Sequence, residues 1–452
     1  MSKVEKSFSR LANQTIFDPI MNIPETNLPR VVIVGGGFGG LSVASSLKGA
    51  AVQVVLFDRN NYHTFQPLLY QVASSGLEPD SIAFPIRKIF RKQKNFEFRM
   101  TEVQEIIAEK KIIVTNIGEL KYDYLVLATG SQTGFFGLKN VEEQCMPMKT
   151  IPQALDLRSM ILQNFEKAML LTDSKEIEKL LNFVVVGGGP TGVELAGALA
   201  EMKLHVLPVD YPGLDASRMQ IYLLEAGAIL LSAFSEVSSA STFKFLSDLG
   251  VNVLLNTAVQ DYDGEKVKTN TDNDLISSTM IWAAGVEGAA VKGIEGEALL
   301  RNKRLAVDEH NRVKGFENVF AIGDVANMSN DVRFSKGHPM VAQVAIQQGD
   351  LLAKNIKNTL AQKSLKSFKY KDLGSMATIG RNKAVVELPF LKMQGVFAWF
   401  VWMFVHLMAL VGWRNRAVTL VNWMWSYFNY DRGVRLIIRP FKKCATNLTN
   451  SR

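Results

Sequence analysis

The chain contains one glycine-rich sequence twice. VVIVGGGFGGLSVA occupies residues 31–44, and FVVVGGGPTGVELAGAL occupies residues 183–199. Such glycines allow a tight turn after a buried strand, let the backbone approach a pyrophosphate, and bring a helix N-terminus toward the anion. A single copy also occurs as a turn in other α/β proteins, but two copies with matching flanks predict two Rossmann-like dinucleotide-binding domains. The predicted contacts are Gly35, Gly37 and Gly40 in the first copy and Gly187, Gly189 and Gly192 in the second.

Each dinucleotide-binding domain also needs an acidic residue at the end of its next strand, where the carboxylate accepts hydrogen bonds from ribose hydroxyls. The strand VQVVLFD ends at Asp58, and the strand QIYLLEAG ends at Glu225. Because Glu225 is farther from its glycines, we expect an insertion at residues 208–217. An acid here would repel a 2′-phosphate, so the second site should prefer NADH to NADPH. The alternatives are a turn aspartate at position 58 and a structural carboxylate at position 225.

A second pattern surrounds the second copy. YDYLVLATGS at residues 122–131 and STMIWAAGV at residues 278–286 each read as an apolar strand followed by a turn of small residues. They have the form expected of crossovers between nested domains. Later, NVFAIGDVA at residues 318–326 places Asp324 after a strand and a glycine, where we expect it to open a helix.

Together these features resemble the two-dinucleotide-domain flavin reductases, over about residues 30–385. The resemblance implies that Asp324 binds the ribitol chain of FAD. It also implies that one domain holds FAD while the domain inserted into it presents NADH to the flavin, which accepts the hydride. We expect these further residues to contact the cofactors: Phe38, Arg59, Ala128, Gly130, Gly285, Gly323, Ala342 and Gln343.

The fold alone does not name the electron acceptor. The two cysteines, Cys145 and Cys444, form no paired motif, which argues against disulfide, sulfide:quinone, iron–sulfur and metal chemistry. HPMVAQVAIQQGDLLAKNI at residues 338–356 places Gln343 and Gln347 on one face of a helix, beside the short side chains of Ala342 and Ala345. Such a helix face could lie under a flavin ring and present the glutamine amides as donors to a quinone carbonyl. The common alternative is a surface helix whose glutamines are simply exposed to solvent.

This stretch resembles the AQxAxQ signature of type II NADH dehydrogenases, the single-subunit NADH:quinone oxidoreductases. Three other segments are also similar to that family: NYHTFQPLLYQVASSGLEP at 61–79, GGGPTGVELAGALAEM at 187–202, and SMATIGRNKAVVEL at 375–388. The resemblance implies that Glu194 lies near the isoalloxazine, where nicotinamide and quinone chemistry meet. A first-turn carboxylate stabilised by the helix dipole is the alternative for Glu194.

Quinone reduction takes up two protons while NADH supplies one hydride, so one group or water chain must deliver the other proton. The candidates are Glu194, His63 and Lys383. His63 reads more readily as a structural histidine of a loop, and Lys383 as a solvated lysine.

The C-terminal sequence is apolar and then basic. Met393 to Trp413 is a run of 21 residues without Asp, Glu, Lys or Arg, about 31 Å as a helix and therefore close to a bilayer core. Between Arg414 and Arg452 there are six arginines and two lysines against one acid, Asp431, so most of the formal charge of +8 lies here. A single span would put this basic tail and the flavin domains on opposite sides of the membrane, and we expect no signal peptide that would export those domains.

We therefore favour two helices, at roughly 393–412 and 416–428, lying in the membrane interface with aromatic residues at the acyl boundary. A single span and a core or dimerisation role for this region are the alternatives. The predicted organisation is a lead-in at 1–29, an FAD-binding domain at 30–147 and 286–385, an NADH-binding domain at 148–285, and membrane-associating helices with a basic tail at 386–452.

The sequence thus predicts an α/β flavoprotein that acts as a non-proton-pumping respiratory NADH:quinone oxidoreductase. The expected partners are NADH, a membrane quinone (menaquinone or ubiquinone), the bilayer surface and a second copy of the chain, with no nucleic acid. The expected location is the cytoplasmic face of the inner membrane. Two alternatives are a flavin reductase that serves a protein acceptor such as ferredoxin, and a flavoprotein whose membrane or signalling contacts matter more than turnover.

Overall fold

The computed structural model describes residues 21–271, 273–429, 434–438 and 440–441. This part of the chain divides into two compact units, both assembled from separate stretches of sequence. Residues 1–20 of the predicted lead-in lie outside the described residues. Unit 1 contains the described residues up to Asn61, Ile86–Gly130 and Gly288–Tyr370, and unit 2 contains Tyr62–Pro85, Ser131–Glu287 and the described residues from Lys371 onward.

Unit 1 is built around a parallel five-stranded sheet in the order β21-β9-β1-β2-β5. Its central strands are buried along nearly their whole length, as expected for a parallel sheet covered on both faces. Helices α2 (Phe38–Ser46) and α12 (Ala342–Leu360) pack together on one face. The strands are β1 (Arg30–Val34), β2 (Gln53–Asp58), β5 (Phe96–Met100), β9 (Tyr124–Leu127) and β21 (Val319–Ala321).

The other face of this sheet packs against a small antiparallel sheet. Val32 and Val34 of β1 share a hydrophobic core with Ile106 and Ile113, which belong to that sheet. Its strands pair in the order β6-β7-β8, and they are β6 (Val103–Ile107), β7 (Ile112–Thr115) and β8 (Gly118–Lys121).

Unit 2 repeats the arrangement around the second glycine-rich sequence. Its parallel sheet has the order β11-β18-β12-β13-β14, and its inner residues Val184 and Val186 pack with Tyr262 and Val267 of an antiparallel sheet. The repeated sequence therefore folds into a repeated structure. The parallel strands are β11 (Met146–Pro147), β18 (Thr279–Trp282), β12 (Asn182–Val186), β13 (Gln220–Leu224) and β14 (Val251–Leu254), and the antiparallel strands are β15 (Val259–Tyr262), β16 (Lys266–Thr269) and β17 (Leu275–Ile276).

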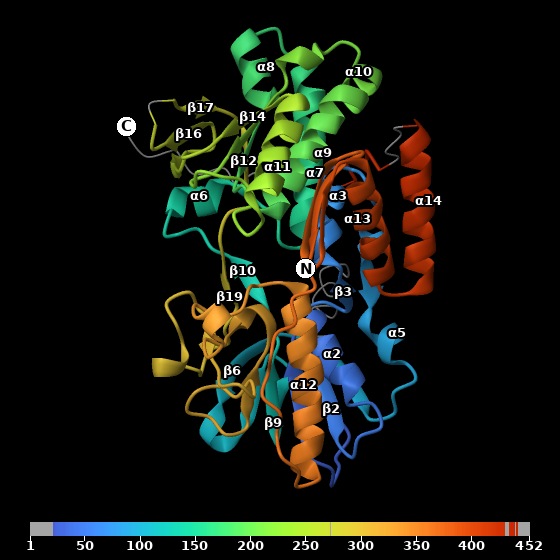
Figure 1. The fold of residues 1–452 in the computed structure, drawn as a ribbon, viewed down its shortest axis with the longest axis vertical. Helices are drawn as coiled ribbons and strands as arrows, with labels where there is room; N and C mark the ends of the chain where they lie inside the picture. Colours follow the sequence, from blue (N-terminus) through green and yellow to red (C-terminus); the bar gives the residue numbers. More distant parts are fainter. Residues whose placement is uncertain (1–20, 272, 430–433, 439, 442–452) are drawn as a thin grey trace, which may run out of the picture. The chain divides into compact units, whose positions relative to one another are not determined.

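Helix α9 (Pro190–Glu201) follows the second glycine turn, and the chain does not return directly to the sheet. A turn of π-helix at Met202–Val206, the short helix α10 (Leu207–Asp210) and a loop precede β13. This confirms the expected insertion between the helix and the strand that ends at Glu225. Helices α7 (Ile151–Ala168), α8 (Ser174–Leu181) and α11 (Glu236–Asp248) also belong to unit 2 (Figure 1).

The strands expected near residues 122–131 and 278–286 are present as β9 and β18. The chain runs on from them into β10 (Ser131–Thr133) and β19 (Val286–Gly288), which pair with each other. The domain boundaries given above stay a prediction, because the two compact units are defined by contacts and not by bound cofactors.

The C-terminal part of unit 2 is a three-stranded antiparallel sheet followed by two helices that run side by side (Figure 1). Its first strand packs on α9 so closely that a Cβ on Gly197 would lie 1.7 Å from the carbonyl oxygen of Ile379. The elements are β23 (Ser375–Gly380), β24 (Lys383–Leu388), β25 (Leu391–Gln394), α13 (Val396–Ala409) and α14 (Trp413–Asn429).

The two expected C-terminal helices are confirmed, with ends that differ from the prediction. Gly395 and Gly412 have φ of +79° and +88°, and these left-handed residues set the start of α13 and the turn into α14. The apolar run from Met393 to Trp413 is therefore not one helix, and no described helix has both the length and the apolar character needed to span a bilayer.

Candidate functional site

The first glycine-rich turn is closely packed at Gly35 and Gly40, whereas Gly37 faces open space. Gly35 has φ of +107°, and a Cβ on Gly40 would lie 1.9 Å from the carbonyl oxygen of Gly35. A Cβ on Gly37, which precedes α2, would meet nothing within 4 Å. Phe38 is the first residue of that helix. The turn thus offers open space at a helix N-terminus, which fits the pyrophosphate of a dinucleotide.

The second turn has the same geometry. Gly187 has φ of +113°, a Cβ on Gly192 would again lie 1.9 Å from the preceding glycine's carbonyl oxygen, and Gly189 is again open. Helix α9 begins at Pro190, whose ring suits a first helical position. Both copies of the motif therefore fit a dinucleotide by the same steric criteria.

Both predicted acids stand beside their glycines. An Asp58 carboxylate oxygen accepts a hydrogen bond from the amide of Gly36 at 2.6 Å, and a Glu225 oxygen accepts one from the amide of Gly188 at 2.6 Å. The other Glu225 oxygen accepts from the amide of Gly227 at 2.6 Å. Burial raises the pKa of Asp58, against the opposing effect of amide donors and of the neighbouring arginine. Contact of these acids with a ribose stays a prediction.

The other predicted cofactor residues lie around the same turns. A Cβ on Gly35 would lie 2.3 Å from the carbonyl oxygen of Ala128, so Ala128 forms the back of the first turn. Gly130 and Gly285 have φ of +73° and +70°, which suits the turns after β9 and β18. The Arg59 side chain is largely exposed and forms an ion pair with Glu102 at 3.6 Å.

Asp324 does not open a helix, contrary to the expectation. It lies in a single 3₁₀ turn, Gly323–Val325, and the chain then returns to an extended conformation at Ala326, which pairs with Leu305 of a short strand. Helix α12 starts only at Ala342. The pairing of Ala326 ends the helical turn at once.

Helix α12 carries the two predicted glutamines, both half-buried. The hydroxyl of Tyr370 donates a hydrogen bond to the side-chain oxygen of Gln343 at 3.4 Å. Gln348, which the sequence did not single out, is buried and accepts a hydrogen bond from the amide of Gly323 at 2.7 Å. It therefore fixes the turn that carries Asp324, and its burial beside the predicted pair is visible only in the structure.

Glu194 is a buried carboxyl on α9, and it lies in unit 2. One of its oxygens accepts a hydrogen bond from the amide of Thr378 at 3.4 Å. Burial raises the pKa of Glu194 to about 8. The Thr378 amide and the indole N–H of Trp402 oppose this effect, although the indole geometry falls short of a hydrogen bond. Glu194 is therefore largely protonated at neutral pH.

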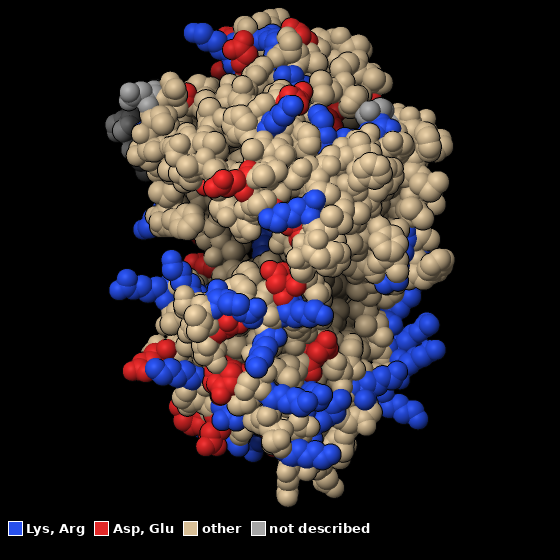
Figure 2. Space-filling view, in the orientation of Figure 1, with Lys and Arg blue, Asp and Glu red and all other residues tan. Residues whose placement is uncertain are grey.

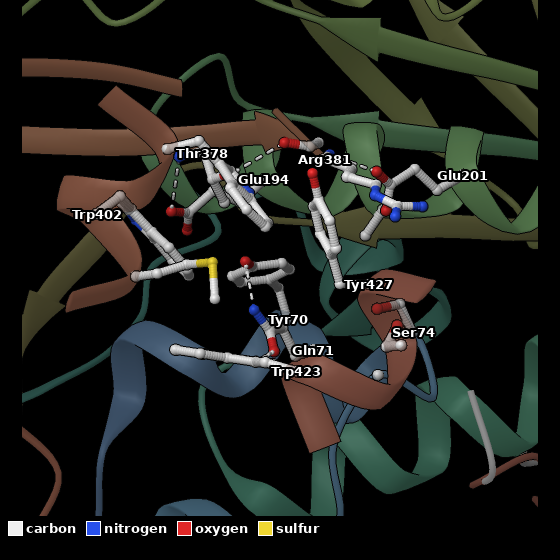
Figure 3. Close-up of a pocket in the computed structure, with 16 residues that line it drawn as sticks. Tyr70, Gln71, Ser74, Glu194, Glu201, Thr378, Arg381, Trp402, Trp423 and Tyr427 are labelled. Carbon is white, nitrogen blue, oxygen red and sulfur yellow. Dashed lines mark hydrogen bonds between the residues drawn. The ribbon is translucent and has the colours of Figure 1, made fainter. Parts of the chain in front are cut away.

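Glu194 lines a pocket with a cavity volume of about 110 Å³ that is open to solvent (Figure 3). The aromatic part of its wall comes from helix α3 (Leu69–Ala73), α13 and α14. A flat aromatic ring with polar groups at its edge suits such a wall. The aromatic residues are Tyr70, Trp399, Trp402, Trp423 and Tyr427, and the polar ones include Glu194, Glu201 and Arg381.

A second, smaller pocket of about 80 Å³ shares Glu194 and Tyr70 with the first. Its other residues come from the segment at 61–79 and from Met148, Lys149 and Thr191. Glu194 thus stands in the wall between two cavities of unit 2. His63 and Lys383, the other proton-donor candidates, line neither of these two pockets.

A buried histidine packs behind the pocket. The ring of His406 stacks on Trp402 with centroids 4.1 Å apart, and its Nδ1 lies 2.8 Å from the Trp402 carbonyl oxygen. Burial lowers the pKa of His406 to about 4, so the ring is neutral at pH 7. Sequence reasoning did not single out Trp402, Glu201 or Arg381, because Trp402 meets Glu194, and the Arg381 amide meets Glu201, across long stretches of sequence. The contact between Trp402 and His406 lies within one helix, and no sequence pattern marked it.

Comparison with known proteins places these features in context. Residues 29–349 match the family model described as pyridine nucleotide-disulphide oxidoreductase. Residues 373–429 match the model described as NDH2 C-terminal domain.

Among curated relatives, the chain is 37% identical over 421 residues to the type II NADH:quinone oxidoreductase NdhA of Mycobacterium tuberculosis, covering 89% of this chain and 88% of the relative. It is 31% identical over 416 residues to the type II NADH:quinone oxidoreductase of Haemophilus influenzae, covering 84% of this chain and 93% of the relative.

Among solved structures, that of NDH2 from Plasmodium falciparum in complex with NADH has a TM-score of 0.83 at 25% identity, covering 91% of this chain and all of that chain. The sulfide:quinone oxidoreductase of Aquifex aeolicus has a TM-score of 0.69 at 18% identity, covering 86% of this chain and 92% of that one. That second likeness concerns the fold alone.

Proposed function

This chain belongs to the type II NADH:quinone oxidoreductases, a non-proton-pumping class within the pyridine nucleotide-disulphide oxidoreductase superfamily, and from that premise we propose that the aromatic pocket beside Glu194 receives the quinone. The observation that carries the proposal is a buried carboxyl, whose pKa is raised by that burial, in the wall of a pocket that contains aromatic rings. A quinone headgroup needs a flat apolar surface and a proton donor for the oxygen that becomes a quinol hydroxyl.

The first glycine turn, Asp58 and Asp324 hold FAD in this proposal. The open face of Gly37 and the bond between Asp58 and the Gly36 amide support it. Bound FAD supplies the two-electron chemistry that links a hydride donor to a quinone. The half-buried Gln343 and Gln347 of α12 remain the proposed amide donors near the isoalloxazine.

The second glycine turn and Glu225 hold NADH. The open face of Gly189 leaves space for the pyrophosphate, and the two amide bonds to Glu225 hold its carboxylate at the strand end. A carboxylate at that position accepts ribose hydroxyls and repels a 2′-phosphate.

Helices α13 and α14 dock the enzyme on a lipid surface on the cytoplasmic side. Their outer side chains are apolar and unusually exposed, with Phe397 81% exposed, Trp413 82% and Phe428 76%. Figure 2 shows that few charged side chains lie over these two helices. Soluble proteins rarely expose so continuous an apolar surface, and quinones partition into lipid, so a pocket bounded by these helices receives its substrate from the bilayer.

Anaerobic stopped flow tests the quinone pocket. Flavin bleaching by NADH is followed first, and the reduced enzyme is then mixed with a short-chain quinone. Ser426→Trp places a large ring in the pocket, whereas Met424→Trp places the same ring on the exposed face of the same helix. We expect Ser426→Trp to slow reoxidation by quinone by about 10-fold or more and to leave bleaching by NADH unchanged. Equal reoxidation rates in the two variants would remove the pocket from the quinone reaction.

A further inference from the structure

We propose that Glu201 takes up a proton from solvent and passes it, through water in the aromatic pocket, to Glu194. This proposal rests on the quinone pocket proposed above, and it gives that pocket a proton entrance at the end opposite to Glu194. Glu201 acts through Glu194 and does not itself contact the quinone.

The two carboxyls lie seven residues apart on α9, so they share one face of the helix, with Ala198 between them. All three residues line the same pocket. Figure 3 shows Glu194 beside Thr378 and Trp402, and Glu201 beside Arg381. One helix therefore places two carboxyls along a single cavity.

The segment around β23 holds each carboxyl in place with one backbone amide. The amide of Thr378 donates to Glu194 at 3.4 Å, and the amide of Arg381 donates to Glu201 at 2.5 Å. These donors come from positions three residues apart, which matches the spacing of the two carboxyls along α9. Both side chains are thus oriented by the same strand and helix pair.

The two ends of the cavity differ in exposure. Glu194 is only 8% exposed, whereas Glu201 is half-buried and reaches solvent. At the Glu201 end, the Arg381 guanidinium lies over the ring of Tyr427, 4.1 Å from its centroid. A proton from bulk water reaches Glu201 first.

The other titratable groups that face Glu194 are few. Tyr70, Arg381 and Tyr427 share the large pocket with it, and Lys149 faces it from the smaller pocket. The Lys149 ammonium donates a hydrogen bond to the hydroxyl of Ser131 at 2.9 Å. Glu201 differs from these groups because it is a carboxyl, reaches solvent and lines the same cavity as Glu194.

The proton balance requires such an entrance. NADH gives up a hydride, which carries two electrons and one proton, and a quinone needs two electrons and two protons to become quinol. The second proton leaves the Glu194 carboxyl for a quinone oxygen, and an O–H bond of the quinol forms. The buried Glu194 carboxylate left behind is costly until it regains a proton. One proton from bulk water, taken up by Glu201, restores it, so NADH, one proton and quinone yield NAD⁺ and quinol.

The cavity has room for the intervening water. A cavity volume of about 110 Å³ has room for several water molecules, and the carboxyls, the Tyr70 and Tyr427 hydroxyls and Ser426 supply polar partners along its walls. Direct contact between the two carboxyls is not needed.

The test uses Glu201→Gln, which keeps the oxygen that accepts from the Arg381 amide and removes the exchangeable carboxyl proton. Glu236→Gln is the matched control, because Glu236 is an exposed carboxyl on the neighbouring helix α11. Bleaching by NADH and reoxidation by a short-chain quinone are followed by anaerobic stopped flow from pH 6 to pH 9, with and without imidazole.

We expect Glu201→Gln to bleach normally with NADH and to reoxidise about 10-fold or more slowly at pH 9. Above a pKa of about 8 most of Glu194 is ionised and must regain a proton before quinol forms, and general acid catalysis contributes on that scale. Imidazole, a small proton carrier that can enter the pocket, should restore the rate, and Glu236→Gln should behave as the parent protein. A structural role for Glu201 would not respond to imidazole.

Three outcomes are distinguishable. Slow reoxidation that imidazole restores supports the relay. If Glu201→Gln reoxidises normally at every pH, or slowly but without response to imidazole, the relay is wrong. If Ser426→Trp also reoxidises normally, the quinone pocket itself is wrong, and the relay fails together with the proposed function.

Discussion

The indole N–H of Trp423 on α14 donates a hydrogen bond to the side-chain oxygen of Gln71 on α3 at 2.9 Å. The amide of Gln71 in turn donates to the hydroxyl of Tyr70 at 2.8 Å. Helix α14 is thereby linked to α3, whose residues Tyr70 and Gln71 line the pocket beside Glu194. The C-terminal helices are part of the fold of unit 2 and form one wall of its main cavity.

Asn415 provides a test of this attachment. Its buried side-chain amide lies within hydrogen-bond distance of the backbone oxygens of Asp80, Ser81 and Ala83, at 2.9 to 3.2 Å. Asn415→Ala leaves those carbonyls without their donor, and we expect it to lower the free energy of unfolding by about 1–3 kcal/mol. Urea unfolding measures the change. Asn429→Ala, at the exposed end of the same helix, is the control and should be near neutral.

Two glycine substitutions in the second turn should distinguish an effect on folding from an effect on NADH binding. Gly192→Ala would put a Cβ 1.9 Å from a carbonyl oxygen, so we expect poor folding or loss of the NADH site. Gly189→Ala has open space and ordinary φ, so the protein should fold normally and bind NADH at least about 10-fold more weakly. Thermal unfolding and NADH titration of both variants measure the two effects. Normal NADH affinity in Gly189→Ala would contradict the assignment of this turn.

Glu225 should set the choice between the two nicotinamide nucleotides. Glu225→Gln keeps an acceptor oxygen for only one of the two amides, that of Gly188 or that of Gly227, and removes the charge that repels a 2′-phosphate. We expect the preference for NADH over NADPH to fall by about 10-fold. The ratio of flavin bleaching rates with NADH and NADPH measures it, and an unchanged ratio would leave Glu225 with a structural role only.

The raised pKa of Glu194 predicts a specific pH dependence of stability. In the unfolded chain a glutamate titrates near 4.5, and in the native protein Glu194 titrates near 8. Between these values the native state binds the extra proton, so this contribution to stability is full below pH 4.5 and is lost as pH rises through 8. Glu194→Gln should remove the decline.

The window from pH 6.5 to 8 isolates this effect. The native pKa of His406 is near 4 and its unfolded value is near 6.5, so its contribution has the opposite sign and is lost as pH falls through that lower range. Urea unfolding at pH 6.5, 7.25 and 8 compares the two proteins. Parallel curves for the parent protein and Glu194→Gln would show that Glu194 titrates normally.

Gln347 should matter for the quinone and not for NADH. Gln347→Ala removes one amide from the half-buried face of α12, and we expect bleaching by NADH to persist while reoxidation by quinone slows about 10-fold. Stopped flow of the two half-reactions measures this. Equal loss in both half-reactions would count against the assignment of Gln347 to the quinone side.

The sequence predicted the repeated dinucleotide folds because their signals are local. The alternation of a buried strand, glycines and a helix lies within single short stretches, and Asp58 and Glu225 follow one strand later. The function prediction is confirmed for the same reason, since the AQxAxQ stretch is contiguous and the relatives are type II NADH:quinone oxidoreductases.

The chemistry around Glu194 was not predictable in this way. Thr378 and Trp402 meet the carboxyl across nearly two hundred residues of sequence, and no local pattern marks them. The helix expected at Asp324 was wrong because a long-range strand pairing of Ala326 overrides local preference. The break between the two C-terminal helices was expected, but their ends at Gly395 and Gly412 were not, since hydropathy does not show backbone handedness.

The close approach of Gly197 to Ile379 has a consequence for inhibition. Helix α9 begins at the nucleotide turn and carries Glu194 and Glu201 in its middle and at its end, and no Cβ separates it from β23. Sliding α9 along that strand would bring its side chains against the strand backbone, so we expect α9 and β23 to move together and to connect the nucleotide turn with the aromatic pocket. A compound bound among the aromatic rings of the pocket beside Glu194 should then also change the affinity of the protein for NADH. Its inhibition should be mixed and not purely competitive.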